Sequence, residues 1–329
     1  MFKQKIYCCL TMIFGLMLFS SRSTAQELHY ADIASMNIWY NQSLKLDTKS
    51  DIRLNYRDVK YQSLVAFRTG GAMLNLPVFK SQQGSASQNS YFNLTAAGTF
   101  DQSNAGIFKN NTYLLGLSYA QQLSASQTFL AAGFQVSNTR SIFGSSNVTY
   151  PDQFDQYGPL PIGTQDPLRA GRSYSWSSLN AGISMFQNTE EKEWYVGASI
   201  RHINKPYTDE LKTQANRLSA AFGIQGGLTM KSEFDQFGVY GLANWQANAY
   251  EYLIGAKFSK ILSKPDASSE GNTIGAGIAL RVHDAIIPNV QMKFNKTSIG
   301  IHYDLNISGL KASGYARQAF ELAITQQLN

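Results

Sequence analysis

A histidine and an aspartate stand two residues apart in IGIHYDLNI, residues 299–307. On an extended strand, His302 and Asp304 would share one face, with side chains about 6–7 Å apart. Such a pair could bind a metal or form a catalytic dyad. A hydrolase would also need a positioned serine, for which Ser298 and Ser308 are ordinary strand-end candidates. The alternate positions hold only Ile, Tyr and Leu. We therefore favour a strand with one polar face, which includes His302 and Asp304, and one apolar face.

Other patterns for metal or phosphate chemistry are weak. The four histidines, at positions 29, 202, 283 and 302, have no close metal-ligand spacing, and no Gly-rich loop ending in Lys-Ser or Lys-Thr occurs. Cys8 and Cys9 both lie in the N-terminal apolar run, so the rest of the chain has no thiol for a nucleophile or a zinc site. We predict no catalytic residue, no metal site, no cofactor and no enzymatic activity.

The stretch NVTYPDQFDQYG, residues 147–158, gathers aromatic and acidic side chains around one proline. Aromatic side chains are favoured anchors in protein interfaces, which suggests a partner-contact loop. A lid packed over the mouth of its own fold explains the same pattern, and both interpretations stay open. The candidate contact residues are Tyr150, Asp152, Phe154, Asp155 and Tyr157.

The composition suggests a chain that meets lipid. Only 15% of the 329 residues are charged, whereas soluble domains carry about 25%, and the chain holds 19 Phe, 18 Tyr and 26 Gly. After the first 20 residues no stretch approaches the roughly 18 uninterrupted apolar residues of a membrane helix. Only helices and closed barrels satisfy every backbone group in lipid. We therefore expect an all-β protein, an outer-membrane antiparallel β-barrel.

The N-terminus has the pattern of a Sec-type signal peptide. Lys3 and Lys5 precede an apolar run at 6–19, and the small residues of 23–25 form a cleavage pattern. We assign 1–25 to the signal peptide, 26–50 to an N-terminal periplasmic segment and 51–329 to the barrel. Without the signal peptide, 25 basic residues face 22 acidic ones. This net charge of +3 is too mild to indicate nucleic-acid binding.

Period-two patterns predict about 14 strands, a number that puts both termini on the periplasmic side. The longest gap, 139–172, would then be external, whereas 71–90 would be an unexpectedly long inner connection. A soluble two-domain sandwich is the less favoured alternative. The predicted strands are 52–59, 63–70, 91–100, 113–123, 129–138, 176–186, 194–203, 218–230, 237–247, 252–262, 273–282, 290–296, 299–307 and 320–328.

Several stretches, taken in order, resemble the PorP/SprF family of type IX secretion system outer-membrane proteins. No Pro occurs at 31–46, where the opening segment of the family is Pro-containing. The stretches that carry the resemblance are LNYRDVKYQSLVAF (54–67), LGLSYAQQLSASQTFLAAGFQVS (115–137), SNVTYPDQFDQYG (146–158), WYVGASIRHINKP (194–206) and IGIHYDLNISGL (299–310) with FELAI (320–324).

The resemblance implies a non-catalytic outer-membrane barrel that serves type IX secretion. Members retain or help to export large cell-surface proteins, including gliding adhesins, through the C-terminal domains of those proteins, and others associate with periplasmic ring components. The expected partners are therefore outer-membrane lipid, such C-terminal domains and the periplasmic ring, and not nucleic acid. Two rival functions are a FadL-like transporter for a hydrophobic or small solute and an outer-membrane hydrolase.

Overall fold

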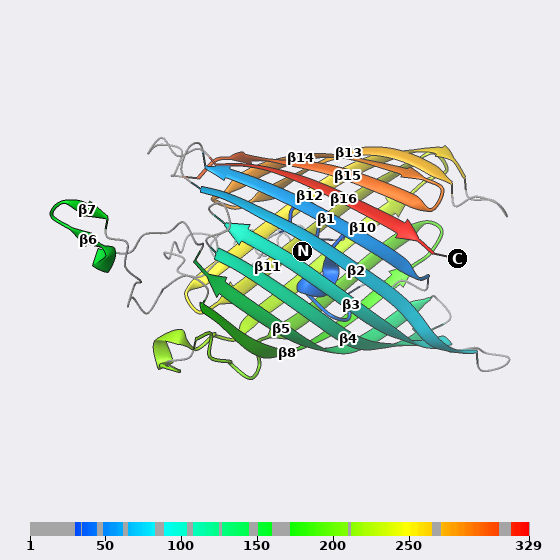
Figure 1. The fold of residues 1–329 in the computed structure, drawn as a ribbon. Coiled ribbons are helices and arrows are strands. Elements are labelled where there is room, and N and C mark those ends of the chain that lie inside the picture. The colour runs from blue at the N-terminus through cyan, green and yellow to red at the C-terminus, as the bar shows by residue number, and fades with distance from the viewer. Residues whose placement is uncertain are drawn as a thin grey trace, which may run out of the picture.

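A single ring of strands surrounds a short N-terminal segment in this protein (Figure 1). The computed structural model describes residues 30–33, 35–44, 49–61, 65–82, 89–103, 108–124, 127–144, 151–159, 172–209, 212–264, 271–308 and 317–328. No helix in these ranges is long and apolar enough to cross a membrane. The predicted signal peptide, 1–25, lies outside the described residues.

Within the described ranges, fourteen antiparallel strands close into one barrel, in agreement with the sequence prediction. Each strand pairs with its neighbour along the chain, and the first pairs with the last. The wall strands are β1 (Asp51–Tyr61), β2 (Val65–Gln82), β3 (Asn89–Ser103), β4 (Phe108–Ser124), β5 (Thr128–Phe143), β8 (Arg172–Asn188), β9 (Lys192–Arg201), β10 (Ala221–Lys231), β11 (Asp235–Gln246), β12 (Ala249–Ser263), β13 (Asn272–Arg281), β14 (Ala285–Phe294), β15 (Thr297–Asn306) and β16 (Arg317–Gln327).

The seam between β1 and β16 completes the wall. Asp51 lies opposite Gln327 at one end of the seam, and Tyr61 lies opposite Arg317 at the other, with unbroken register between them. A closed ring leaves no unpaired strand edge in lipid, where each unsatisfied backbone group would cost several kcal/mol.

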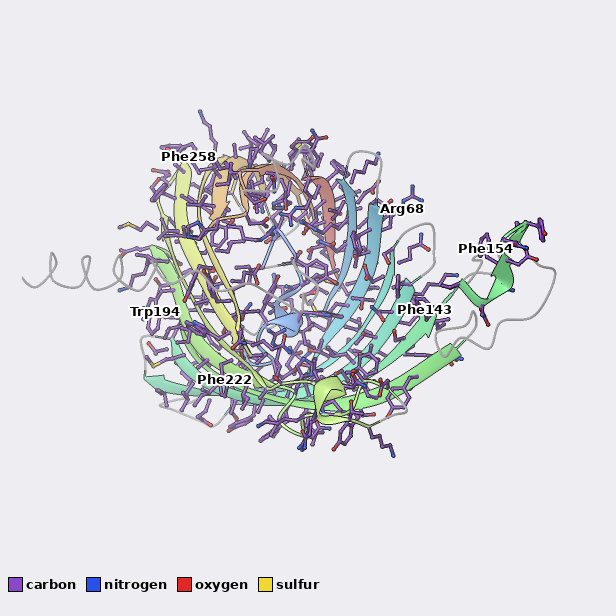
Figure 2. All side chains as sticks on the ribbon, turned by 90° about the vertical axis from the view of Figure 1, so that its left-hand side faces the viewer. Arg68, Phe143, Phe154, Trp194, Phe222 and Phe258 are labelled. Carbon is purple, nitrogen blue, oxygen red and sulfur yellow. The ribbon has the colours of Figure 1, made fainter. Side chains whose placement is uncertain are left out.

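The two faces of the wall differ as the alternation in 299–307 predicts. On β15, Ile301 is 46% exposed on the outside, whereas His302 and Asp304 are each 1% exposed inside the barrel. The same alternation runs round the ring, and Figure 2 shows the exposed Phe258 on its outer side. The apolar face therefore meets membrane hydrocarbon, as predicted.

Several strand boundaries differ from their predictions by a few residues, and the largest difference is at the end of β2. The predicted strand at 63–70 continues to Gln82 as β2, so the expected long inner connection at 71–90 is short. The sequence suggested an end because Gly70-Gly71 and Pro77 are usual strand breakers. The period of two continues beyond the glycines, since Met73 and Asn75 are buried in the lumen.

The described residues 30–33 and 35–44 of the segment that we assigned to an N-terminal periplasmic segment, 26–50, lie inside the barrel. We call residues 30–44 the plug. It contains the short 3-10 helix η1 (Asn37–Trp39), which both views show within the ring of strands (Figures 1 and 2). Tyr30, Met36 and Ile38 are at most 4% exposed and pack with wall residues such as Met73 and Ile287. The apolar core of the molecule is therefore built by the plug.

The connections have unequal lengths at the two ends of the barrel. The long connections 144–171, 202–220 and 307–316 all join strands at the end of the barrel opposite Gln327, the last residue of β16. Outer-membrane barrels have short periplasmic turns and longer external loops. This end is therefore external, and it carries the 3-10 helices η3 (Pro151–Gln153) and η4 (Gln214–Asn216) and the hairpin β6 (Phe154–Asp155) and β7 (Gly158–Pro159).

Replacing Ile301 by Arg should lower the free energy of unfolding by about 2–4 kcal/mol, because a lipid-facing charge near the bilayer midplane loses its hydration. The matched change Ile301→Leu keeps the apolar volume and should cost less than about 1.5 kcal/mol. Urea unfolding in lipid vesicles, followed by heat-modifiability on gels, measures both. Equal tolerance of the two changes would contradict the outward facing of Ile301.

Candidate functional site

Two carboxylates buried in the lumen bind arginines from distant strands. Asp304 on β15 accepts hydrogen bonds from Arg57 on β1 at 2.6 Å and from Arg281 on β13 at 2.9 Å. Glu321 on β16 accepts a second one from Arg57 at 2.8 Å. All four side chains are less than 10% exposed. Charges taken out of water need such pairing, since an isolated buried ion costs several kcal/mol.

Further charged groups extend this cluster toward the external end. Arg281 also lies 3.3 Å from Glu251 on β12 and 3.2 Å from Asp284 in the turn before β14. Asp284 in turn accepts a hydrogen bond from Arg317, the first residue of β16. The cluster therefore ties five strands together across the lumen, including both sides of the β1–β16 seam.

Glu321 also holds the plug. Its Oε2 accepts a hydrogen bond from the backbone N–H of Ala31 at 2.7 Å, and its Oε1 accepts one from Asp32 N–H at 3.3 Å. The side-chain amide of Asn55 on β1 donates to Oε1 at 2.9 Å. One carboxylate therefore joins the plug to the arginine cluster.

The far end of the plug binds the opposite wall. The Asn41 amide donates to Gln225 Oε1 at 3.0 Å, and Gln42 donates to Ser118 Oγ at 3.0 Å. Ser199 Oγ donates to the Tyr40 carbonyl at 2.6 Å. These bonds reach β4, β9 and β10, so the plug spans the lumen from the seam to the wall opposite.

Lumen-facing glycines make room for two of these side chains. A Cβ at Gly182 would lie 2.0 Å from Asn41 Oδ1, and one at Gly197 would lie 2.7 Å from Asn41 Nδ2. Gly116 and Gly133 leave similar space for Gln42, whose atoms would come within 2.3 and 2.6 Å of the added Cβ atoms. Real Cβ contacts are never so close, so a larger residue at any of these four positions would require the Asn41 or Gln42 side chain to shift.

Two buried tyrosines add a neutral contact inside the plug. Tyr40 Oη accepts a hydrogen bond from Tyr30 N–H at 2.9 Å and lies 3.3 Å from the Tyr30 carbonyl. Burial, which disfavours the charged form, raises the pKa of both phenols well above the ordinary value of a tyrosine. Both hydroxyls therefore stay protonated at physiological pH.

The plug separates two cavities in the described part of the lumen. The outer cavity has a volume of about 360 Å³ and is lined by Trp39 of the plug, Trp176 and Arg201. The inner cavity, of about 280 Å³, is lined by Asp32 of the plug, Tyr195 and Lys257. A passage through the barrel would require the plug to move.

His302 and Asp304 lie in the lumen as predicted, but they do not form a dyad. The Asp304 carboxylate binds two arginines. The ring of His302 has no hydrogen-bond partner in the described part of the chain, and its Nε2 lies 3.8 Å from Asp32 of the plug. Ser308 Oγ bonds Asn306. Among the described residues, no group of three or more His, Cys, Asp or Glu side chains is placed to hold a metal ion.

The predicted contact loop forms a small hairpin at the external end. Of its five candidate residues, Tyr150 lies outside the described ones. Asp152 lies in η3, and Phe154 and Asp155 form β6, whose turn to β7 holds Tyr157. Phe154 is 52% exposed and Tyr157 is 88% exposed, and Figure 2 shows Phe154 well outside the ring of strands. These aromatic side chains do not pack as a lid.

The sequence from residue 46 to 325 matches the family model described as "Type IX secretion system membrane protein PorP/SprF". The chain belongs to the PorP/SprF family. No curated protein matches it. The family and the barrel fold together establish an outer-membrane protein of type IX secretion.

Two solved structures resemble this PorP/SprF chain in barrel fold alone. The first is a FadL homologue of Pseudomonas aeruginosa, with 11% identity and a TM-score of 0.47 over 86% of this chain and 91% of the other. The second is the COG4313 outer membrane channel of Pseudomonas putida F1, with 8% identity and a TM-score of 0.45 over 92% and 100%.

Replacing Asp304 by Asn should lower the free energy of unfolding by about 3–5 kcal/mol, because two buried arginines lose their shared partner. The matched change Glu233→Gln breaks the exposed pair with Lys264 and should cost at most about 1 kcal/mol. Denaturant titration of both purified variants measures the difference. Equal stabilities would show that the buried cluster does not hold the barrel together.

Replacing Gly182 by Ala should displace the plug, since the new methyl overlaps Asn41. Overpacking of this kind costs about 1–3 kcal/mol, which raises the displaced population about fivefold to a hundredfold. In the control Gly226→Ala, the added Cβ lies no closer than 3.5 Å to any other atom. A cysteine introduced at the buried Ser43 reports displacement through its rate of thiol labelling. Unchanged labelling in Gly182→Ala would contradict the fitted role of this glycine.

Proposed function

We propose that this PorP/SprF barrel is a non-catalytic receptor that recognises or anchors secreted cell-surface proteins, such as gliding adhesins, through their C-terminal domains. The observation that carries the proposal is the external hairpin with its exposed Phe154 and Tyr157. The family supplies the context of type IX secretion.

The filled lumen supports a receptor rather than an open conduit. Contacts at Glu321 and at the four fitted glycines hold the plug at both ends. The plug residues Tyr30, Met36 and Tyr40 are at most 2% exposed. A secreted domain is far larger than either cavity, so the surfaces available to it are the outer wall and the external loops.

The hairpin has the chemistry of a protein-contact surface. Aromatic side chains provide large contact areas at low entropic cost and dominate binding energies when they are buried by a partner. Asp152 and Asp155 place acidic groups beside these rings, and Asp155 Oδ1 accepts the Tyr157 backbone N–H at 2.8 Å, which orders the turn. A partner with basic groups around an apolar pocket would complement this surface. Periplasmic ring components are the proposed partners of the opposite end.

Transport of a hydrophobic or small solute is the second candidate function, and the two cavities favour it. Each could hold a small molecule, and the outer one combines Trp39 and Trp176 with the guanidinium of Arg201. This function requires a moving plug, whereas the receptor function does not.

Replacing Phe154 and Tyr157 together by Ala should release one or a few specific proteins from the cell surface while the barrel still assembles. Loss of two interface anchors costs upwards of about 2 kcal/mol and should weaken retention roughly thirtyfold or more. Quantitative proteomics of surface and released fractions, beside affinity capture from solubilised outer membrane, measures the effect. The control is Phe234→Ala, an exposed aromatic at the periplasmic end.

An unchanged set of surface proteins in the double variant would contradict the receptor function. If uptake of a small solute into vesicles depends on the barrel and Gly182→Ala raises it, the transporter function is the correct one.

A further inference from the structure

A groove on the outer wall lies where the apolar band of the barrel ends. It has a volume of about 520 Å³ and opens outward across β1 to β4. Its lining is Tyr56, Arg68, Gly70, Phe100, Asp101, Gln102, Lys109 and Asn111, and the Asp101 carboxylate accepts a hydrogen bond from the lumen-facing Thr69. The groove shares only Asp101 with the lining of the outer lumen cavity and includes no residue of the hairpin, and its position does not depend on the proposed receptor function.

The floor of the groove is a glycine between two aromatic rings. Gly70 pairs with Tyr56 on one side and with Phe100 on the other, and both rings are exposed. A Cβ built at Gly70 meets no atom within 4 Å, so the missing side chain leaves an open slot. An apolar slot in the lipid-facing wall, near the end of its apolar band, fits an acyl chain.

Two basic side chains lie directly above the slot. Arg68 follows Gly70 as the next outward residue toward the external end, and it pairs with Gln102, which in turn pairs with Lys109. Two strand spacings separate Arg68 from Lys109, about 10 Å between backbones. Their long side chains can therefore reach one anionic group. Both are exposed, and neither forms an ion pair with the described residues.

The basic residues gather on one part of the wall at this level. Lys60 on β1 and Arg140 on β5 are also exposed near the external ends of their strands. The acidic residues at this level are Asp58, 3.9 Å from Lys60, and Asp101 in the lining of the groove. In the described part of the wall from β10 to β16, the outward positions near the external ends of the strands are uncharged. They include Phe222, Trp245, Tyr250, Leu280, Ile286 and Leu305.

We propose that this groove binds a phosphate-bearing lipid of the outer leaflet, with its phosphate between Arg68 and Lys109 and an acyl chain over Gly70. Figure 2 shows Arg68 on the outer side of the ring. Arginine forms two parallel hydrogen bonds to phosphate oxygens, and lysine adds a point charge. The border between aromatic residues and charged ones is the level at which headgroups begin. The two basic side chains, the open slot over Gly70 and the position of the groove at the end of the apolar band therefore all fit a phosphate-bearing lipid.

Native mass spectrometry of the detergent-purified barrel, titrated with bisphosphorylated lipid A, tests the site. The double variant R68Q/K109Q should bind at least about tenfold more weakly, because each basic residue near an anionic lipid contributes about fivefold. Gly70→Leu should fold normally, since its side chain enters open space, and should also lose binding by filling the slot. The control Lys260→Gln removes an exposed charge at the periplasmic end of β12 and should bind as the wild type does.

Two further ligands distinguish the source of the phosphate. Dephosphorylated lipid A should bind more weakly than the phosphorylated form, and inorganic phosphate alone should not compete with it. Equal binding by the wild type, R68Q/K109Q and Gly70→Leu would overturn the proposal. Competition by inorganic phosphate at equal concentration would also overturn it, because the groove would then be a free-anion site and not a lipid site.

Discussion

The buried carboxylate of Glu321 joins the barrel wall to the segment that fills it. It pairs with Arg57 across the β1–β16 seam and accepts the backbone N–H groups of Ala31 and Asp32. A carboxylate at 0% exposure is stable only with such partners. Because its partners come from the first strand, the last strand and the plug, this one group requires a closed ring and a filled lumen together.

Because the ring is closed and its lumen is filled, the inner and outer faces of the wall have different contacts. The lumen supplies ionic and amide contacts that hold the plug, and the outer wall is left to lipid except at its rim. The external hairpin and the border of the apolar band are the two described surfaces at the external end for which we propose a ligand. Both sit at one end of the barrel, so a protein held by Phe154 and Tyr157 would lie above the same leaflet that meets Arg68 and Lys109.

Local pattern predicted the wall well and the interior poorly. The alternation around His302 gave the correct facing of β15, because a strand with one face in lipid and one in a polar lumen must alternate. The end of β2 was wrong because Gly70-Gly71 resembles a break. The plug was missed because its buried residues, Tyr30, Met36 and Tyr40, follow no regular period. Pairs such as Arg57 with Asp304, 247 residues apart in sequence, leave no local signal at all.

The seam contacts have a kinetic consequence for how the barrel is made. Ala31 and Glu321 are 290 residues apart, so their bond can form only after nearly the whole chain is available. Contacts of such long range are slow to form because loop-closure entropy must be lost first. The contacts of the plug to β4, β9 and β10 involve earlier strands, whereas its bond to Glu321 needs the final strand. Sealing of the wall and fastening of its contents are therefore a single late event, and a chain that stops before β16 has neither.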